Sequence, residues 1–407
     1  MVEQTQVYDF WSDSAHANPQ AVYAQMRQQD PVHRRINPNN GPALWILTRY
    51  DDCVAMLKDP RFGKDVYKNL PREDAQRWRA DPKSDDPWVM IDQHLLNIDP
   101  PDHTRLRALV HKVFTPRMVE DLRPRILAIA NELLDQMADS TEADLIDSFA
   151  FPLPIIVIAE MLGIPAADRD QFRKWTKILL FSGDYDDNKS ALMEFSIYMN
   201  QMIDERQTNP QSDIISALVQ AEENGDTLNR LELMSMLFLL LVAGHETTVN
   251  LIGNGTLALM QHPQELRKLR ENRALMKSAI EEMLRFNGPV DLTTMRWAFE
   301  DVALGDTVIP RGAPVVASLL AANRDPEHFP NPDQFDITRD PNKHIAFGTG
   351  IHYCVGAPLA RLEGAIALNA LLDRLPRLEL ACDETELEWR SFVIIHGMTK
   401  LPVRYTP

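Results

Sequence analysis

Apolar residues recur at helical spacing through the middle of the chain. Between residues 105 and 260 they return every three or four positions, in segments such as RLRALVHKVF (105–114) and FPLPIIVIAEMLG (151–163). This period places the apolar residues on one face of a helix, so the pattern predicts a mostly helical region. The 28 prolines tend to lie between these segments, where they end one helix before the next begins.

Shorter β-like stretches flank the helical region. Residues 32–50 indicate two strands around an Asn-Gly turn, followed by a short helix that Pro60 ends. Stretches with a similar pattern return at 302–320 and 390–405. No internal repeat and no linker rich in Gly or Ser divides the sequence. We therefore predict one domain over residues 1–407, mainly α with a small β-rich lobe built from about 32–50, 302–320 and 390–405.

Composition narrows the class of protein. Hydrophobic residues make up 44% and charged residues 25%, as in an ordinary globular protein. The formal net charge of −17 argues against nucleic acid as a main partner, because phosphate binding needs a basic surface. The first residues, MVEQTQVYDFWSDS, contain no apolar signal-peptide core. The most apolar run, residues 233–243, is shorter than the ~20 residues that span a bilayer, so we expect a buried core helix and a cytoplasmic protein without a membrane anchor.

The three cysteines, Cys53, Cys354 and Cys382, do not suggest a disulfide framework, because they are few and odd in number. In a reducing compartment a special cysteine is more often a ligand or a nucleophile. No glycine loop between a strand and a helix indicates a nucleotide site, so we expect no bound NAD or FAD.

The segment FGTGIHYCVG (347–356) places Cys354 on a glycine-rich turn directly before an Ala- and Leu-rich segment. A metal-binding thiolate needs shelter from water and nearby backbone N–H groups, and the dipole at a helix N-terminus favours its charge. Gly348, Gly350 and Gly356 can take positive φ angles and approach a flat ligand closely, and Pro358 suits the first turn of a helix. The competing interpretation is a buried, inert cysteine beside a turn.

The pattern Phe-Gly-x-Gly-x-His-x-Cys-x-Gly resembles the haem-binding signature of the cytochrome P-450 family. The resemblance extends over nearly the whole chain, and it implies a triangular, mostly helical prism with a small β lobe and a bound haem b (iron protoporphyrin IX). Cys354 would be the axial ligand of the iron, Phe347 would shield its sulfur, and His352 would contact a propionate. Gly348 and Gly356 would complete the haem-binding turn.

A second match lies in the apolar segment LLLVAGHETTVNL (239–251). A buried Glu beside a Thr is costly unless the groups are hydrogen-bonded or functional. The run resembles the family's Ala/Gly-Gly-x-Asp/Glu-Thr element, in which Ala243 and Gly244 border the haem, Thr247 lines the oxygen site and Glu246 delivers protons. Alternatively, the Thr247 hydroxyl bonds back to the carbonyl of Ala243, and the two interpretations are compatible. We expect His245 to be structural and not a second iron ligand.

Two further sets of residues follow from the resemblance. Glu282 and Arg285 match the family's Glu-x-x-Arg element, which with Arg339 supports the haem-binding core; the alternative is an exposed ion pair worth roughly 0.2–0.5 kcal/mol. The haem propionates need cations. The basic residues around 103–107 could instead be the solvated start of a helix, which is the interpretation we give to Arg105. The resemblance assigns the propionates to His103, Arg107, Arg296 and His352.

The resemblance implies a bacterial haem-thiolate monooxygenase, which inserts one atom of O₂ into a C–H or C=C bond of a lipophilic molecule. Electrons would come from a separate ferredoxin- or flavodoxin-type protein, because the chain carries no flavin or iron–sulfur signature. The alternatives are a peroxide-driven peroxygenase, against which Glu246 and Thr247 argue, and a non-catalytic haem-thiolate sensor or lipophile carrier. We expect a monomer.

Family position also predicts a substrate pocket and a surface for the electron donor. The pocket would be mainly apolar, which suits a macrolide, terpenoid, steroid or fatty acid, under a lid formed by residues 172–204. A basic surface on the cysteine side would receive the donor, although charge runs on helices are often only solvated. This surface comprises Arg105, His111, Lys112, Arg117 and Arg361. The pocket comprises Trp88, Val89, Met90, Leu239, Leu240, Val290, Leu292, Thr293, Thr294, Val393 and Ile394.

Overall fold

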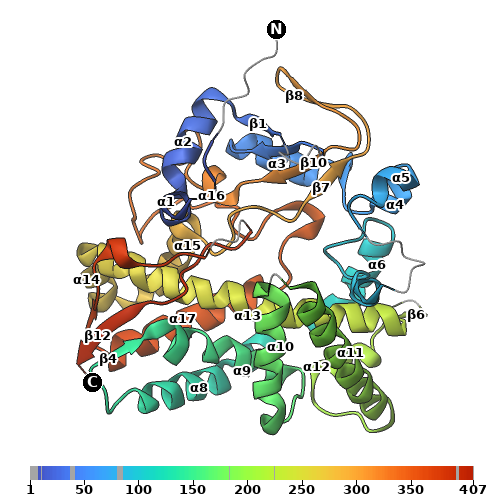
Figure 1. Cartoon of the computed structure of the whole chain (residues 1–407). Helices are drawn as coiled ribbons and strands as arrows, with labels where there is room; N and C mark the ends of the chain where they lie inside the picture. Colours follow the sequence, from blue (N-terminus) through green and yellow to red (C-terminus); the bar gives the residue numbers. More distant parts are fainter. Residues whose placement is uncertain are drawn as a thin grey trace. The chain divides into compact units, whose positions relative to one another are not determined.

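A computed structural model describes residues 8–10, 12–36, 42–79, 86–182, 184–223, 225–390 and 394–406. The chain divides into two compact units, and two helices, α8 (Arg123–Gln136) and α13 (Arg230–Gln261), have residues in both (Figure 1). Unit 1 comprises Met1–Lys64, Ala130–Ala150 and Thr247–Pro407, and unit 2 comprises Asp65–Ile129 and Phe151–Glu246. This division does not test whether residues 1–407 form a single domain, which stays a prediction.

Unit 1 contains a five-stranded sheet built from distant parts of the chain. Strands β2 and β10 are parallel, with Trp45 opposite Val315, and the other pairs are antiparallel. The strands predicted within 32–50 and near 314–317 are confirmed, whereas the predicted turn between the first two falls on residues 37–41, outside the described residues. The order across the sheet is β1 (Val32–Arg35), β2 (Leu44–Leu47), β10 (Pro314–Ala317), β7 (Arg296–Ala298) and β3 (Phe62–Gly63).

The remaining strands of unit 1 form separate sheets. The C-terminal strand β12 (Pro402–Thr406) pairs with β11 (Arg377–Leu380) and with β4 (Glu142–Asp144). A hairpin of β8 (Val302–Leu304) and β9 (Thr307–Ile309) pairs only within itself. The predicted stretch 390–405 therefore does not join the same sheet as 32–50, because an apolar alternation identifies a strand but not its partner.

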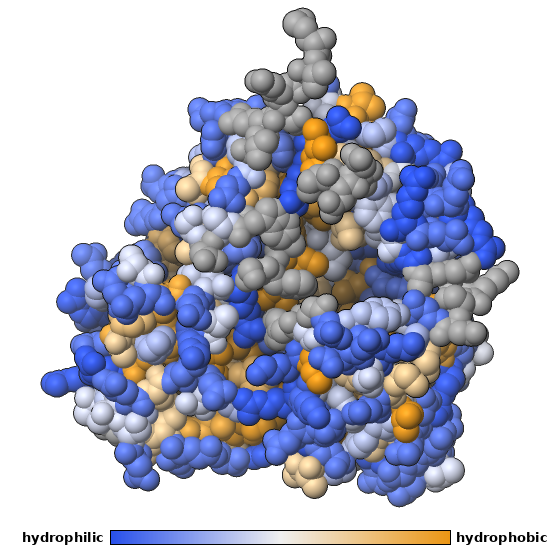
Figure 2. All heavy atoms as spheres, viewed as in Figure 1, coloured by the Kyte–Doolittle hydropathy of each residue, from blue (hydrophilic) through white to orange (hydrophobic). Residues whose placement is uncertain are grey.

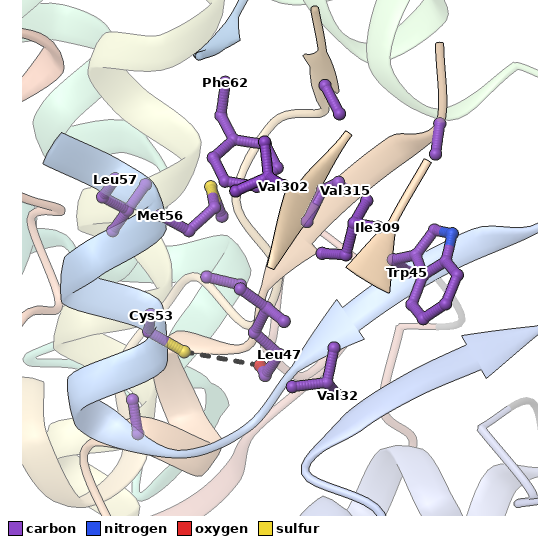
Figure 3. Packing of buried hydrophobic residues seen from close by; sticks show 14 of the residues in the cluster. Val32, Trp45, Leu47, Cys53, Met56, Leu57, Phe62, Val302, Ile309 and Val315 are labelled. Atoms are coloured by element: carbon purple, nitrogen blue, oxygen red, sulfur yellow. Dashed lines mark hydrogen bonds between the residues drawn. The ribbon is translucent and has the colours of Figure 1, made fainter. Parts of the chain in front are cut away.

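The five-stranded sheet packs against α3 (Tyr50–Lys58), which ends before Pro60 as predicted. Cys53 and Met56 on this helix are fully buried among residues of β2 and β10 such as Leu47 and Val315 (Figure 3). The Cys53 Sγ lies 3.4 Å from the carbonyl oxygen of Leu47. Cys53 is therefore a residue of the hydrophobic core.

A second core in unit 1 forms where the C-terminal half of α13 meets α15 (Met276–Asn287) and α17 (Ala357–Arg374) (Figure 1). A Cβ added at Gly364 of α17 would lie 3.0 Å from Leu251 and 3.2 Å from Ile280, so these helices approach closely. The other helical elements of unit 1 are α1 (Asp13–Ala17), α2 (Pro19–Gln29), η2 (Ile146–Ala150), α14 (Pro263–Glu271), η4 (Arg273–Leu275), α16 (Leu319–Ala322), η5 (Gly350–His352) and η6 (Glu384–Glu386).

The described residues of unit 2 form helices and a single two-stranded pair, β5 (Glu222–Glu223) and β6 (Asp226–Thr227). The predicted lid corresponds to α10 (Arg169–Phe181) and α11 (Tyr185–Thr208), which pack through aromatic rings; the ring centroids of Phe172 and Phe195 are 6.1 Å apart. The other elements are α4 (Val66–Asn69), α5 (Arg72–Ala75), η1 (Pro87–Ile91), α6 (Asp102–Val113), α7 (Pro116–Asp121), α9 (Pro152–Met161), η3 (Ala166–Asp168) and α12 (Ile214–Val219).

Helix α13 is the one described helix whose length and hydropathy would allow it to cross a bilayer. Of its most apolar 18-residue window 67% is buried, as in the core helix of a globular protein. Leu233, Met236 and Leu237 are at most 3% exposed, so the predicted core helix is confirmed. The face of the molecule in Figure 2 is largely hydrophilic, with apolar side chains at the surface in scattered patches.

Candidate functional site

Cys354 lies on the turn between η5 and α17, and its side chain is exposed. Its backbone N–H donates to the carbonyl of Phe347 (3.0 Å), and its own carbonyl accepts from the N–H of Ala357 (3.5 Å). Helix α17 then runs for 18 residues, with Gly356 as its N-cap and a proline in its first turn. The predicted thiol at a helix N-terminus is confirmed, and the interpretation as a buried cysteine is wrong.

The glycines of this turn serve different purposes. Gly348 and Gly350 take positive φ angles of 67° and 75°, as predicted. The prediction is wrong for Gly356, whose φ is −81° because it caps the helix. A Cβ at Gly350 would lie 2.7 Å from the carbonyl oxygen of Leu57, so the close approach there is to the backbone of α3. A Cβ at Gly348 would meet no atom within 4 Å, so the turn borders open space.

Arg296 begins strand β7 and is 4% exposed, and its Nη1 donates to the carbonyl of Phe62 (3.2 Å). Lys64, 2% exposed, donates from Nζ to the hydroxyl and carbonyl of Thr294 (2.6 and 2.9 Å) and to the carbonyl of Met295 (2.7 Å). Lys64 therefore fixes the segment that leads into Arg296. No sequence pattern indicated Lys64, because its partners are mostly backbone carbonyls 230 residues away.

The Glu282–Arg285 pair is fully buried and bidentate, with two N–O distances of 2.8 Å. Arg339 approaches the same carboxylate at 3.2 Å, and Asn342, which no pattern indicated, donates to it at 3.1 Å. Arg285 also donates to the carbonyls of residues 323, 332 and 334. The structure thus brings the three predicted residues together, and the alternative of an exposed surface pair is wrong.

In the middle of α13 a single face is open. Ala243 is exposed and Leu239, Gly244 and Thr247 are partly exposed, whereas Leu240 is buried. Positions 239, 243 and 247 are four apart and share one side of the helix. A Cβ added at Gly244 would lie 3.5 Å from Ile158 of α9, an ordinary contact. A side chain at this position would therefore point toward the core of unit 2.

Glu246 and His245 are buried, at 0% and 1% exposed. The Nδ1 of His245 lies 2.9 Å from the carbonyl oxygen of Leu241, its Nε2 lies 3.7 Å from the Glu246 carboxylate, and its ring meets Phe151 edge to face. His245 is therefore a core residue, as predicted. The buried carboxylate beside Thr247 is the costly arrangement that the sequence singled out.

In unit 2, His103, Arg107 and His111 lie four residues apart along one side of α6. His103 is 2% exposed, which contradicts a solvated helix start, and the Nε of Arg107 donates to His111 Nε2 at 3.0 Å. Arg105 was expected to be solvated and to belong to the donor surface. Instead it pairs with Glu232 and Asp226, because residues near the start of α13 offer two carboxylates.

The predicted pocket residues of unit 2 lie on two neighbouring elements. Trp88 and Val89 of η1 are partly buried, and Met90 is 39% exposed. The carbonyl of Met90 accepts from the hydroxyl of Ser235 (3.1 Å), one turn before Leu239 on α13. The two predicted pocket segments of unit 2 are therefore adjacent.

In unit 1 the predicted pocket residues 290–294 lie beside Ile394, because the N–H of Asp291 donates to the carbonyl of Ile394 (2.9 Å); Val393 lies outside the described residues. The Asp291 carboxylate accepts from the hydroxyls of Tyr23 (2.7 Å) and Ser318 (3.0 Å). Burial raises the pKa of Asp291 to about 7. This side chain and Leu292 border a cavity of about 90 Å³.

The described residues fit a haem. The iron would need a thiolate or an imidazole, and the two propionates would need cations. Cys354 offers an exposed thiol beside open space at Gly348, and Arg296 is a buried cation of the same unit. In unit 2 the basic side of α6 and the open face of α13 are surfaces of the kind that a flat, dianionic ligand requires.

Comparison with known proteins agrees. The sequence pattern of the family described as "Cytochrome P450" matches residues 157–401. The polyketide biosynthesis cytochrome P450 PksS of Bacillus subtilis is 47% identical over 95% of this chain and 96% of its own, and its solved structure aligns with a TM-score of 0.92 over 98% of this chain and 100% of its own. The myxobacterial cytochrome P450 CYP267B1, solved with myristic acid, gives a TM-score of 0.90 at 50% identity, covering 97% of this chain and 98% of its own. The cytochrome P450 monooxygenase PikC of Streptomyces venezuelae is 45% identical over 96% of this chain and 91% of its own.

Sequence identity of 45–50% over nearly the whole length shows that this chain shares the fold, the cofactor and the reaction class of these proteins. The predicted family and the mainly α fold with small β sheets are confirmed. The chain belongs to the cytochrome P450 family: it is a haem-binding monooxygenase that transfers one atom of O₂ to a small-molecule substrate with electrons from a redox partner.

Proposed function

We propose that Cys354 is the axial ligand of the haem iron and that this haem–thiolate centre oxidises a lipophilic secondary metabolite. The observation that carries the proposal is the exposed thiol on a turn with two positive-φ glycines at the N-terminus of α17. The helix dipole and the backbone N–H groups of the turn favour the thiolate over the thiol. Phe347, whose carbonyl accepts the cysteine N–H, would cover the sulfur.

Arg296 and His352 of unit 1 would hold a haem propionate. The assignment of His103 and Arg107 of unit 2 to the propionates stays a prediction. Arg296 is buried, so its charge would interact strongly with a carboxylate in a site that water leaves. Lys64 would keep the Arg296 segment in place. Glu282, Arg285 and Arg339 would act indirectly, by fixing the chain that precedes the cysteine turn.

When bound, the haem supplies an iron centre at which O₂ is activated. Protons must then reach the oxygen site without opening it to bulk water. Glu246, fully buried, would carry protons from within α13, and Thr247, partly exposed on the open face, would pass them on through its hydroxyl. A carboxyl and a hydroxyl on consecutive residues suit these two roles. The carboxyl can take up and release a proton, and the hydroxyl can accept one hydrogen bond while it donates another.

Thr247→Ala is expected to leave haem binding and substrate-induced spectral shifts intact. The fraction of consumed NAD(P)H that appears as product should fall on the order of tenfold, with a matching rise in hydrogen peroxide, because misdirected protons release reduced oxygen. Thr256→Ala is the matched control, since Thr256 lies on the same helix and its hydroxyl donates to the carbonyl of Ile252 (2.7 Å). Equal coupling in the two variants would remove Thr247 from proton delivery.

The substrate would be a polyketide-like or fatty-acyl lipophile. The predicted pocket residues of each unit are mainly apolar. Among the relatives, PksS is named for polyketide biosynthesis, and CYP267B1 was solved in complex with myristic acid. Apolar pockets gain affinity from burying apolar area, with a few hydroxyls such as Thr293 and Thr294 to orient the ligand. Titrating macrolides, their aglycones and fatty acids while recording the Soret spectrum would rank these classes.

We infer a ferredoxin- or flavodoxin-type electron donor that docks on basic residues of α6 and α7. Arg117 is 92% exposed, with its nearest carboxylate, Asp121, at 4.0 Å. Lys112 is exposed and donates to a backbone carbonyl. Arg105 and Arg361 are held by carboxylates of this chain, so they contribute less to such a surface than the sequence implied. No disulfide joins the three cysteines, all of which are described, and this supports the proposal of a reducing cytoplasm.

Arg117→Glu is expected to slow reduction of the iron by an acidic ferredoxin roughly fivefold at low salt, because about 1 kcal/mol of Coulomb energy is at stake in water. The difference should disappear at high salt, and substrate affinity should not change. Arg377→Glu on β11 changes the net charge equally and serves as the control. If both variants are reduced as fast as the wild type at low salt, the donor docks elsewhere.

A further inference from the structure

A charged cluster lies beside the cysteine turn of unit 1. Arg361, in the second turn of α17, donates from Nε and Nη2 to the two carboxylate oxygens of Glu281 on α15 (2.6 and 2.8 Å). The Nε2 of His344 lies 3.0 Å from the same carboxylate. The two side chains of the Arg361–Glu281 pair are 33% and 23% exposed, so the pair is shielded from water over most of its surface.

The guanidinium of Arg361 also contacts two residues linked to Cys354, its chain neighbour Tyr353 and its hydrogen-bond partner Phe347. Its Nη1 donates to the hydroxyl of Tyr353 (3.2 Å), the residue that precedes Cys354. Its central carbon lies 4.4 Å from the ring centroid of Phe347, a cation–π contact, and the carbonyl of Phe347 accepts the N–H of Cys354. Glu281 thus holds a positive charge against Tyr353 and Phe347, two residues of the cysteine turn.

Both members of the pair stay charged at physiological pH. Burial raises the pKa of the Glu281 carboxyl, but hydrogen bonds from Arg361 and His344 outweigh this and lower the pKa to about 2. The hydrogen bond to Glu281 raises the pKa of Arg361. The pair therefore places two opposite, permanent charges beside the cysteine turn, and neither residue belongs to the Glu-x-x-Arg network.

We propose that the Glu281–Arg361 pair sets the reduction potential of the loaded protein, with Arg361 favouring the reduced state and Glu281 opposing it. Accepting one electron from the redox partner adds one negative charge to the iron–thiolate unit and changes no bond in the pair. A positive charge held nearby stabilises that added charge, and a negative one destabilises it. The inference rests on the proposed ligation by Cys354.

The test is a redox titration of the purified haem-loaded protein, followed by its spectrum. At a fixed potential, Arg361→Gln is expected to lower the ratio of reduced to oxidised protein at least threefold, which is about 28 mV for one electron at 59 mV per tenfold. Glu281→Gln, whose amide oxygen still accepts from Arg361, is expected to raise the ratio at least threefold. Loss of a merely structural contact would shift both variants in the same direction.

Arg374→Gln is the matched control, because Arg374 lies on the same helix, is 38% exposed and pairs with Asp135 at 2.7 Å; its ratio should stay within 1.5-fold of the wild type. Arg361→Lys, which keeps the charge, should also stay closer to the wild type than Arg361→Gln. Shifts of equal sign in Arg361→Gln and Glu281→Gln, or shifts no larger than the control's, overturn the proposal. If Arg361→Gln does not fold, the upward shift in Glu281→Gln decides alone. A wild type without the thiolate spectrum would refute the ligand assignment instead.

Discussion

Cys354→Ala is expected to abolish the red-shifted Soret band that the reduced, carbon monoxide-bound protein shows when a thiolate lies opposite the gas. Alanine offers the iron no donor, and Cys53 is fully buried in the hydrophobic core between α3 and the five-stranded sheet. Monooxygenase turnover should fall below detection.

Cys382→Ala is the control for this variant. Cys382 is partly exposed, and burial together with Glu386 and Asp383 raises the pKa of its thiol, so it is a poor candidate for a thiolate ligand. The control should keep the full band and full turnover. A normal thiolate spectrum in Cys354→Ala would refute the ligand assignment and with it the proposed centre.

Glu282→Ala is expected to lower the free energy of unfolding by about 3–5 kcal/mol, because it leaves Arg285 buried without a compensating charge. Arg285 is 0% exposed, and its remaining partners are backbone carbonyls. Natural domains are stable by only about 5–15 kcal/mol, so much of the expressed variant should be unfolded or unable to retain haem. The urea midpoint of unfolding, followed by circular dichroism, measures the loss.

Glu120→Ala tests whether removal of any carboxylate has this effect. Glu120 forms the same kind of i,i+3 pair, with Arg123, but both side chains are more than half exposed, and such pairs contribute little. Its midpoint should match the wild type. A Glu282 variant that unfolds at the wild-type midpoint would show that the buried network does not stabilise the core.

The parts of the structure that the sequence predicts well are those with a local signal. The helical period of the apolar residues predicted the core helix α13, and the position of Pro60 predicted the end of α3. The strands near 32–50 were also recognisable. Their partners were not, because pairing of β2 with β10, and of β12 with β4, depends on contacts between remote segments that no local period records.

The same distinction holds for the site. Cys354, Thr247 and the Glu282–Arg285 pair stand in short motifs and could be named in advance. Lys64 and Asn342 could not, since each acts through partners 230 and 60 residues away. Arg105 was misjudged for the opposite reason: its helix looked solvated, and the carboxylate that binds it lies 127 residues later.

The parallel pairing of β2 with β10 joins strands that leave the ribosome about 270 residues apart. At typical rates of synthesis this interval lasts roughly 14–54 s, and throughout it β2 offers an open edge on which another nascent chain can pair. The cysteine turn emerges later still. Ligation of haem by Cys354 therefore comes only after this interval, and the yield of this protein in a heterologous host will depend on chaperones during synthesis as much as on the supply of haem.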